Sequence, residues 1–176
     1  MGYAGGSKKN PTYHSLGDHA ETLQLDYDAS IITYEQLLEI FWMSHDPAES
    51  TWSRQYMAIA FFHDEEQKKR IGKTLEREAA ARKTEIRTLV LPADTFYIAE
   101  DYHQKHALQL DYELIGEFRK IYPDFRDIID STAAARVNGI MGAFGKLSVH
   151  AKEIDSYGLS DRGKERLIGY LRASLQ

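Results

Sequence analysis

The chain of 176 residues contains no cysteine, and this absence excludes disulfides, thiolate metal sites and cysteine-based nucleophilic catalysis within it. No apolar run reaches the roughly 18 residues that a membrane helix needs. The first residues lack the apolar segment of a signal peptide. Basic runs are absent as well, and the net charge is −5, which argues against nucleic acid or an anionic membrane as partner. We therefore expect a cytoplasmic protein without membrane or nucleic-acid partners.

The patterning of the remaining residues predicts a mixed α+β chain. Alternation over Glu21–Tyr27 predicts a half-buried strand, and the apolar stretch Gln55–His63 predicts a central one. Further strand and helix signals follow the chain: a strand over 86–91, helices over 100–110 and 112–122, a helix capped by Asp130, and a final helix capped by Ser160. Two other helices begin at clear caps, Thr33 with Gln36 and Asp64 with Gln67.

Glu21 is the most informative residue that the pattern alone singles out. It shares strand parity with Leu23, Leu25 and Tyr27, so it is predicted to point with the apolar face. A buried carboxyl tends to stay neutral near pH 7, and a neutral acid can donate a proton or a strong hydrogen bond. The alternative is that Glu21, at the start of the strand, bends towards water.

Tyr13 and Tyr56 are the next candidates. Tyr56 shares parity with Ala58 and Ala60, and small neighbours leave room for a ligand. A phenol is a donor suited to a polar oxygen inside an apolar pocket. The alternative is a structural tyrosine that bonds only to the backbone. The sequence indicates no cofactor and no metal: His103 and His106 lie three residues apart, but no third ligand accompanies them.

Several separated blocks occur in an order that resembles the A-type peptide methionine-sulfoxide reductases. The blocks are GYAGG (2–6), NPTY (10–13), HAE (19–21), SHDP (44–47), QY (55–56) and FY-AEDYHQ (96–97 and 99–104). The stretch Ser131–Gly139 is similar to the tail of one branch of that family. The resemblance implies a ferredoxin-like α/β plait over residues 1–125, followed by a helical C-terminal extension over 126–176.

The resemblance also implies roles for three residues. In the family, a cysteine thiolate attacks the sulfur of methionine S-sulfoxide, a glutamic acid protonates the departing oxygen, and two tyrosines hydrogen-bond to that oxygen. Thioredoxin is the expected reductant. Matched motif by motif, the glutamic acid corresponds to Glu21 and the tyrosines to Tyr13 and Tyr56.

The chain differs from the family pattern because it lacks the segments that carry the thiol chemistry. The GCFWG segment that carries the nucleophile and the methyl-binding aromatics is absent, and no C-terminal resolving cysteine exists. The first strand and first helix of the plait are expected to be missing, which would uncover a sheet edge prone to self-association.

Three hypotheses remain open at this point. The chain is a truncated reductase that is inactive alone, or a non-catalytic paralogue that binds methionine sulfoxide or a protein partner, or a structural chain that pairs with a second subunit through the uncovered edge.

Overall fold

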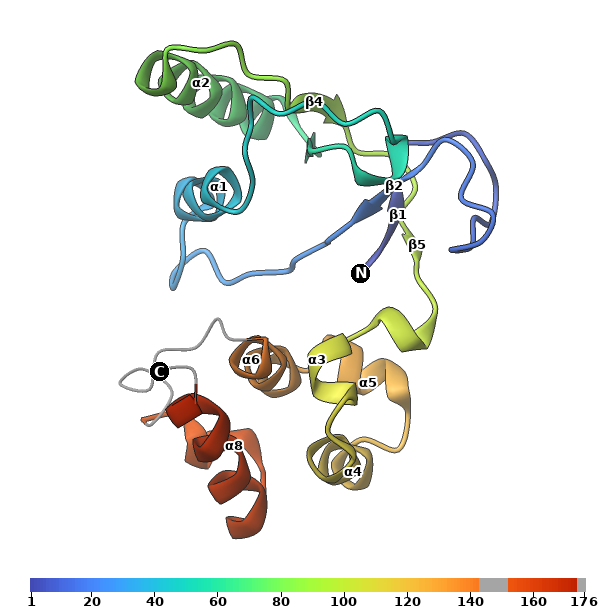
Figure 1. Cartoon of the computed structure of the whole chain (residues 1–176), viewed down its shortest axis with the longest axis vertical. Coiled ribbons are helices and arrows are strands. Elements are labelled where there is room, and N and C mark those ends of the chain that lie inside the picture. The colour runs from blue at the N-terminus through green and yellow to red at the C-terminus, as the bar shows by residue number, and fades with distance from the viewer. Residues whose placement is uncertain (143–151, 174–176) are drawn as a thin grey trace. The chain divides into compact units, whose positions relative to one another are not determined.

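The computed structural model describes residues 1–142 and 152–173, which form two compact units, residues 1–100 and 101–176 (Figure 1). The first unit combines strands with two helices, and the second is helical where it is described. The α+β class expected from the sequence is therefore confirmed at this level. The boundary of the family-like domain at residue 125 stays a prediction.

Unit 1 contains two small sheets. In the first, the central strand β1 (Gly2–Ala4) pairs antiparallel with β2 (Ala20–Thr22) on one side and β5 (Tyr97–Ile98) on the other. In the second, β3 (Ile59–Phe62) and β4 (Leu89–Pro92) run parallel. The register of the first sheet places Tyr3 opposite Glu21.

The two helices of unit 1, α1 (Tyr34–Met43) and α2 (Glu65–Arg82), begin at the predicted caps. Thr33 and Gln36 form a capping box, and Asp64 accepts a hydrogen bond from the amide of Gln67 at 2.7 Å. The core between these helices and β3 contains four buried side chains: Leu38, Trp42, Ala60 and Ile71. Each fully buried large apolar side chain stabilises the fold by about 1.5–3 kcal/mol.

Unit 2 begins with a 3₁₀ turn at Asp101–His103, and another lies at Ile154–Tyr157. Its helices are α3 (His106–Gln109), α4 (Tyr112–Ile121), α5 (Phe125–Asp130), α6 (Thr132–Met141) and α8 (Asp161–Ala173). Their apolar stripes meet in one core, whose fully buried members include Leu108, Leu114, Phe118, Ile128, Val137, Leu167 and Leu171. No helix in the described parts of the chain is long and apolar enough to cross a membrane.

Several predicted boundaries are wrong. The helix expected over 100–110 is a 3₁₀ turn followed by the short α3, and Asp130 ends α5 rather than capping a helix. Ser131 caps α6 instead, because its hydroxyl accepts the amide of Ala134 at 3.2 Å. At α8 the expected cap is confirmed, since the hydroxyl of Ser160 accepts the amide of Gly163 at 3.2 Å.

Candidate functional site

The conformation of the loop between β1 and β2 depends on two glycines and a buried histidine. Gly5 has φ +76°, and a Cβ atom there would lie 2.7 Å from the Phe61 ring. At Gly6 a Cβ atom would lie 2.6 Å from the backbone nitrogen of His19. The ring of His19 accepts the Gly6 amide at Nδ1 (3.2 Å), and its Nε2 donates to the carbonyl of Lys8 (2.7 Å). These contacts explain why this loop needs glycine and histidine at these positions.

Asp18 fixes the other end of the same loop. Its carboxylate accepts the backbone amide of Ser7 at 2.8 Å and the hydroxyl of Ser7 at 3.0 Å. The amide of Lys8 donates to it as well. These donors favour the charged form, and the backbone amide of Ser7 is the largest cause that lowers the pKa of Asp18 to about 2.

Arg54 joins this loop to a 3₁₀ turn at Arg54–Tyr56. Its guanidinium donates to the carbonyl of Gly5 at 2.9 Å and to the carbonyl of Asp18 at 3.1 Å. The turn therefore lies against β2, and it presents Gln55 and Tyr56 next to Glu21. The sequence predicted a strand from Gln55 onward, but β3 begins at Ile59.

Glu21 lies on β2 and is half-buried. Its Oε1 accepts a hydrogen bond from Nε2 of Gln55 at 2.7 Å. The predicted reason for its burial is wrong: β2 ends at Thr22, and Leu23 and Leu25 are 62% and 57% exposed. The apolar face that was to enclose the carboxyl is uncovered in this structure, and Gln55 is the polar group that holds it.

Tyr13 and Tyr56 come together beside Glu21. The pKa of Tyr56 is raised, first by the charge interaction with Tyr13, then by the hydrogen bond between the two phenols and partial desolvation, and also by the charge of Glu21. Three residues that are far apart in the sequence thus form one cluster. Tyr56 was predicted to lie in a strand, on a face covered by other residues. This prediction is wrong, because Tyr56 is the last residue of the 3₁₀ turn and is 61% exposed.

Glu100 belongs to this region as well, although no role for it was predicted from the sequence. Its Oε2 accepts the hydroxyl of the buried Tyr3 at 2.6 Å, and its Oε1 accepts the backbone amide of Tyr13 at 3.0 Å. The carboxyl group therefore fixes the backbone of Tyr13 against β1. Glu100 and Gln55 both belong to the motif blocks. No local sequence pattern indicates that Glu100 contacts Tyr13, 87 positions away, or that Gln55 contacts Glu21, 34 positions away.

The cluster of Tyr13, Glu21, Gln55 and Tyr56 is rich in hydrogen-bond donors. Phenol and amide groups donate, and a carboxyl donates when it is protonated, so a strong acceptor oxygen is the ligand group that fits such a set. The described residues include no group of three histidine, aspartate or glutamate side chains arranged to hold a metal ion. The arrangement can therefore bind and polarise an oxygen atom, while it contains no thiol to attack the atom that carries the oxygen.

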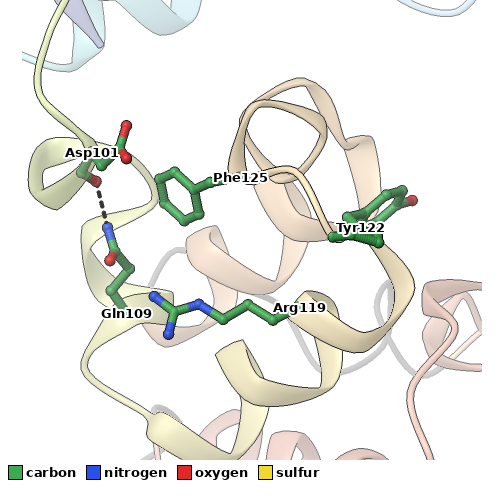
Figure 2. A pocket seen from close by; sticks show the side chains of 6 residues that line it. Asp101, Gln109, Arg119, Tyr122 and Phe125 are labelled. Carbon is green, nitrogen blue, oxygen red and sulfur yellow. Dashed lines mark hydrogen bonds between the residues drawn. The ribbon is translucent and has the colours of Figure 1, made fainter.

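A hollow of about 300 Å³ lies in unit 2. Figure 2 shows Arg119 extending from α4 towards Gln109, with the ring of Phe125 above them in this view. The amide of Gln109 donates to the carbonyls of Asp101 at 2.7 Å and Gln104 at 2.6 Å. Those bonds tie α3 to the preceding turn, so we assign this group a structural role.

Comparison with known proteins adds a family context to this geometry. A sequence profile described as peptide methionine sulfoxide reductase matches residues 1–119. A peptide methionine sulfoxide reductase of Drosophila melanogaster is 36% identical over 162 residues, which cover 91% of this chain and 65% of the relative.

Two other relatives carry the same family name and are also matched over only part of their length. A peptide methionine sulfoxide reductase A5 of Oryza sativa subsp. japonica is 39% identical, over 78% of this chain and 56% of the relative. The peptide methionine sulfoxide reductase MsrA of Methanococcus maripaludis is 37% identical, over 62% of this chain and 75% of the relative. The chain thus spans 56–65% of the length of the fly and rice relatives.

Proposed function

Because the chain belongs to the peptide methionine sulfoxide reductase family, we propose that it binds methionine S-sulfoxide in peptides and proteins through Tyr13, Glu21 and Tyr56. The phenols of Tyr13 and Tyr56 would donate hydrogen bonds to the sulfoxide oxygen, and Glu21 would donate its proton to the same atom. The single observation that supports this proposal most is that the phenols of Tyr13 and Tyr56 share a hydrogen bond beside the Glu21 carboxyl group, which Gln55 holds at 2.7 Å.

The chemistry of these groups favours recognition over reduction. A sulfoxide oxygen carries much negative charge and is a strong acceptor, whereas the sulfur of methionine is a weak one. Reduction of the sulfoxide by the family's route needs a thiolate that attacks sulfur and becomes a sulfenic acid. This chain has no cysteine, so we expect no reductase activity from it alone. Thioredoxin would take part only where the thiols are supplied.

The proposal also concerns the fold around the site. We propose that the sheet of β1, β2 and β5 and the sheet of β3 and β4 correspond to parts of one ferredoxin-like plait, and that residues 126–176 form its helical extension. The cytoplasmic location expected from the sequence stays a prediction.

Calorimetry with a short peptide tests the proposed function. The peptide carries methionine S-sulfoxide at one position, and matched peptides carry methionine or the R epimer there. We expect saturable binding of the S-sulfoxide peptide and much weaker binding of the other two, and Glu21→Gln should weaken the first. Equal affinity for all three peptides, or indifference to Glu21→Gln, would contradict the proposal.

A second candidate function is association with another chain, and a specific observation favours it. Leu23, Leu25 and Ile31 are 62%, 57% and 79% exposed, and they lie in or beyond the extended segment that follows β2. Exposed apolar residues that gather into one patch mark surfaces that bind proteins. Sedimentation equilibrium distinguishes the cases: a monomer at all concentrations argues against self-association, and Leu25→Asp should weaken a dimer if one forms.

A further inference from the structure

The two oxygens of the Glu21 carboxyl group have different surroundings. Oε1 accepts the side-chain amide of Gln55 at 2.7 Å. Among the residues that the structure describes, none donates a hydrogen bond to Oε2. The carboxyl group is therefore held at one oxygen only, and its other oxygen is available to a ligand.

The chemistry of an amide decides where the proton of a neutral Glu21 would sit. The Nε2 group of glutamine donates hydrogen bonds and accepts none. A proton on Oε1 would point at a donor hydrogen, so the neutral acid keeps its proton on Oε2. We propose that Gln55 is a positioning residue, which holds Oε1 and thereby directs the proton of Glu21, on Oε2, to the sulfoxide oxygen. This inference rests on the proposed function and adds a specific role within it.

The position of Gln55 suits this task. It is half-buried in the 3₁₀ turn, between Arg54 and Tyr56. Arg54 is fixed by the carbonyls of Gly5 and Asp18, and the amide of Tyr56 donates to the carbonyl of Ser53 at 3.2 Å. Since the backbone on both sides of Gln55 is held, its amide reaches Glu21 from a defined direction, as an oriented donor requires.

A purely structural role for Gln55 is the competing explanation. In that case the hydrogen bond from Gln55 would only attach the turn to β2. Loss of this bond would then weaken ligand binding equally at every pH. The two explanations differ in how ligand binding depends on pH. The titratable and charged groups on the segments packed against Glu21 are Tyr3, which lies opposite it on β1, and Arg54 and Tyr56 in the 3₁₀ turn. Tyr13 contacts Tyr56, and Glu100 binds the hydroxyl of Tyr3 and the amide of Tyr13.

The first experiment needs no ligand. In nuclear magnetic resonance spectra of the whole chain, the side-chain amide signals of Gln55 are followed from pH 3 to pH 8. We expect one of the two amide protons to shift with the ionisation of Glu21, and this shift to vanish in Glu21→Gln. If the amide signals of Gln55 change neither with pH nor on the substitution Glu21→Gln, the inference is overturned, whatever the protein binds.

The second experiment uses calorimetry with the S-sulfoxide peptide between pH 4 and pH 8. Gln55→Met keeps a side chain of similar length without a donor, and Gln24→Met, at an exposed position, is the matched control. We expect Gln55→Met to weaken binding by about tenfold, the usual scale for a hydrogen bond in a site. The loss caused by Gln55→Met should be largest at low pH, because only the protonated carboxyl group can donate to the sulfoxide oxygen.

The outcomes separate the inference from the function on which it rests. If Glu21→Gln and Tyr56→Phe leave binding unchanged, the proposed function fails. If those variants weaken binding but Gln55→Met has the affinity and the pH profile of the unchanged chain, only the role of Gln55 fails. Equal weakening at every pH would show that Gln55 is structural, and it would overturn the inference in the same way.

Discussion

The hydroxyl of Tyr3 donates a hydrogen bond of 2.6 Å to Oε2 of Glu100, and it joins the first strand of the chain to the residue that ends unit 1. The other oxygen of Glu100 holds the backbone of Tyr13. A side chain that is 1% exposed thus supports a residue of the candidate site through one shared carboxyl group. Support of this kind keeps a site in shape before a ligand arrives.

The first prediction concerns this contact. Tyr3→Phe removes a hydrogen bond to an acidic side chain, so we expect the free energy of unfolding to fall by about 1.5–3 kcal/mol. Urea denaturation measures it. Tyr112→Phe is the matched control, because Tyr112 is 87% exposed, and it should change the free energy by less than about 0.5 kcal/mol. Equal effects of the two substitutions would argue against the role of the Tyr3 hydroxyl.

The second prediction compares two glycines. Gly5 has φ +76° and contacts Phe61, whereas Gly72 lies within α2 with no atom within 4 Å of a Cβ atom built there. Gly5→Ala should therefore destabilise the chain by about 2 kcal/mol or more, from the left-handed backbone and the displaced ring. Gly72→Ala should stabilise it by about 0.5–1 kcal/mol, as alanine does in helices. Thermal unfolding of both variants checks the pair, and a stabilising Gly5→Ala would contradict the loop geometry.

The third prediction concerns pH. The hydrogen bonds from Ser7 lower the pKa of Asp18 from 3.8 to about 2. A lowered pKa means that the carboxylate stabilises the loop fully above pH 3.8, and that this contribution is lost as the pH falls through about 2. Hydrogen exchange at the amide of Ser7 follows the change. Protection should persist at pH 3 in the unchanged chain and be weak at every pH in Asp18→Asn; protection that is already lost near pH 4 would contradict the lowered pKa.

The parts of the fold that depend on neighbouring residues could be predicted from the sequence. The caps at Thr33, Asp64 and Ser160 are examples, because each needs only a side chain and an amide three residues away. The length of β2 could not be predicted, since it is set by pairing with β1, which is only Gly2–Ala4. Leu23 and Leu25 continue the alternation of a strand without a partner strand, and they are exposed.

Some residues of the candidate site could be predicted from the sequence, and others could not. The motif blocks singled out Tyr13, Glu21 and Tyr56, and the structure brings these three together. The predicted reason for their meeting is wrong, because a 3₁₀ turn held by Arg54, rather than a covered strand face, presents Tyr56. Gln55 and Glu100 were missed as partners, since a hydrogen bond between distant segments leaves no periodic signal in one sequence.

The most direct test of the central claim, recognition of a sulfoxide oxygen by the two phenols, is a calorimetric comparison of Tyr13→Phe and Tyr56→Phe. Each variant is titrated with the S-sulfoxide peptide and with the methionine peptide. We predict that each loses about tenfold in affinity for the sulfoxide and nothing for methionine, because only the oxygen accepts from the phenols. Unchanged sulfoxide affinity in both variants, or an equal loss for both peptides, would contradict the account.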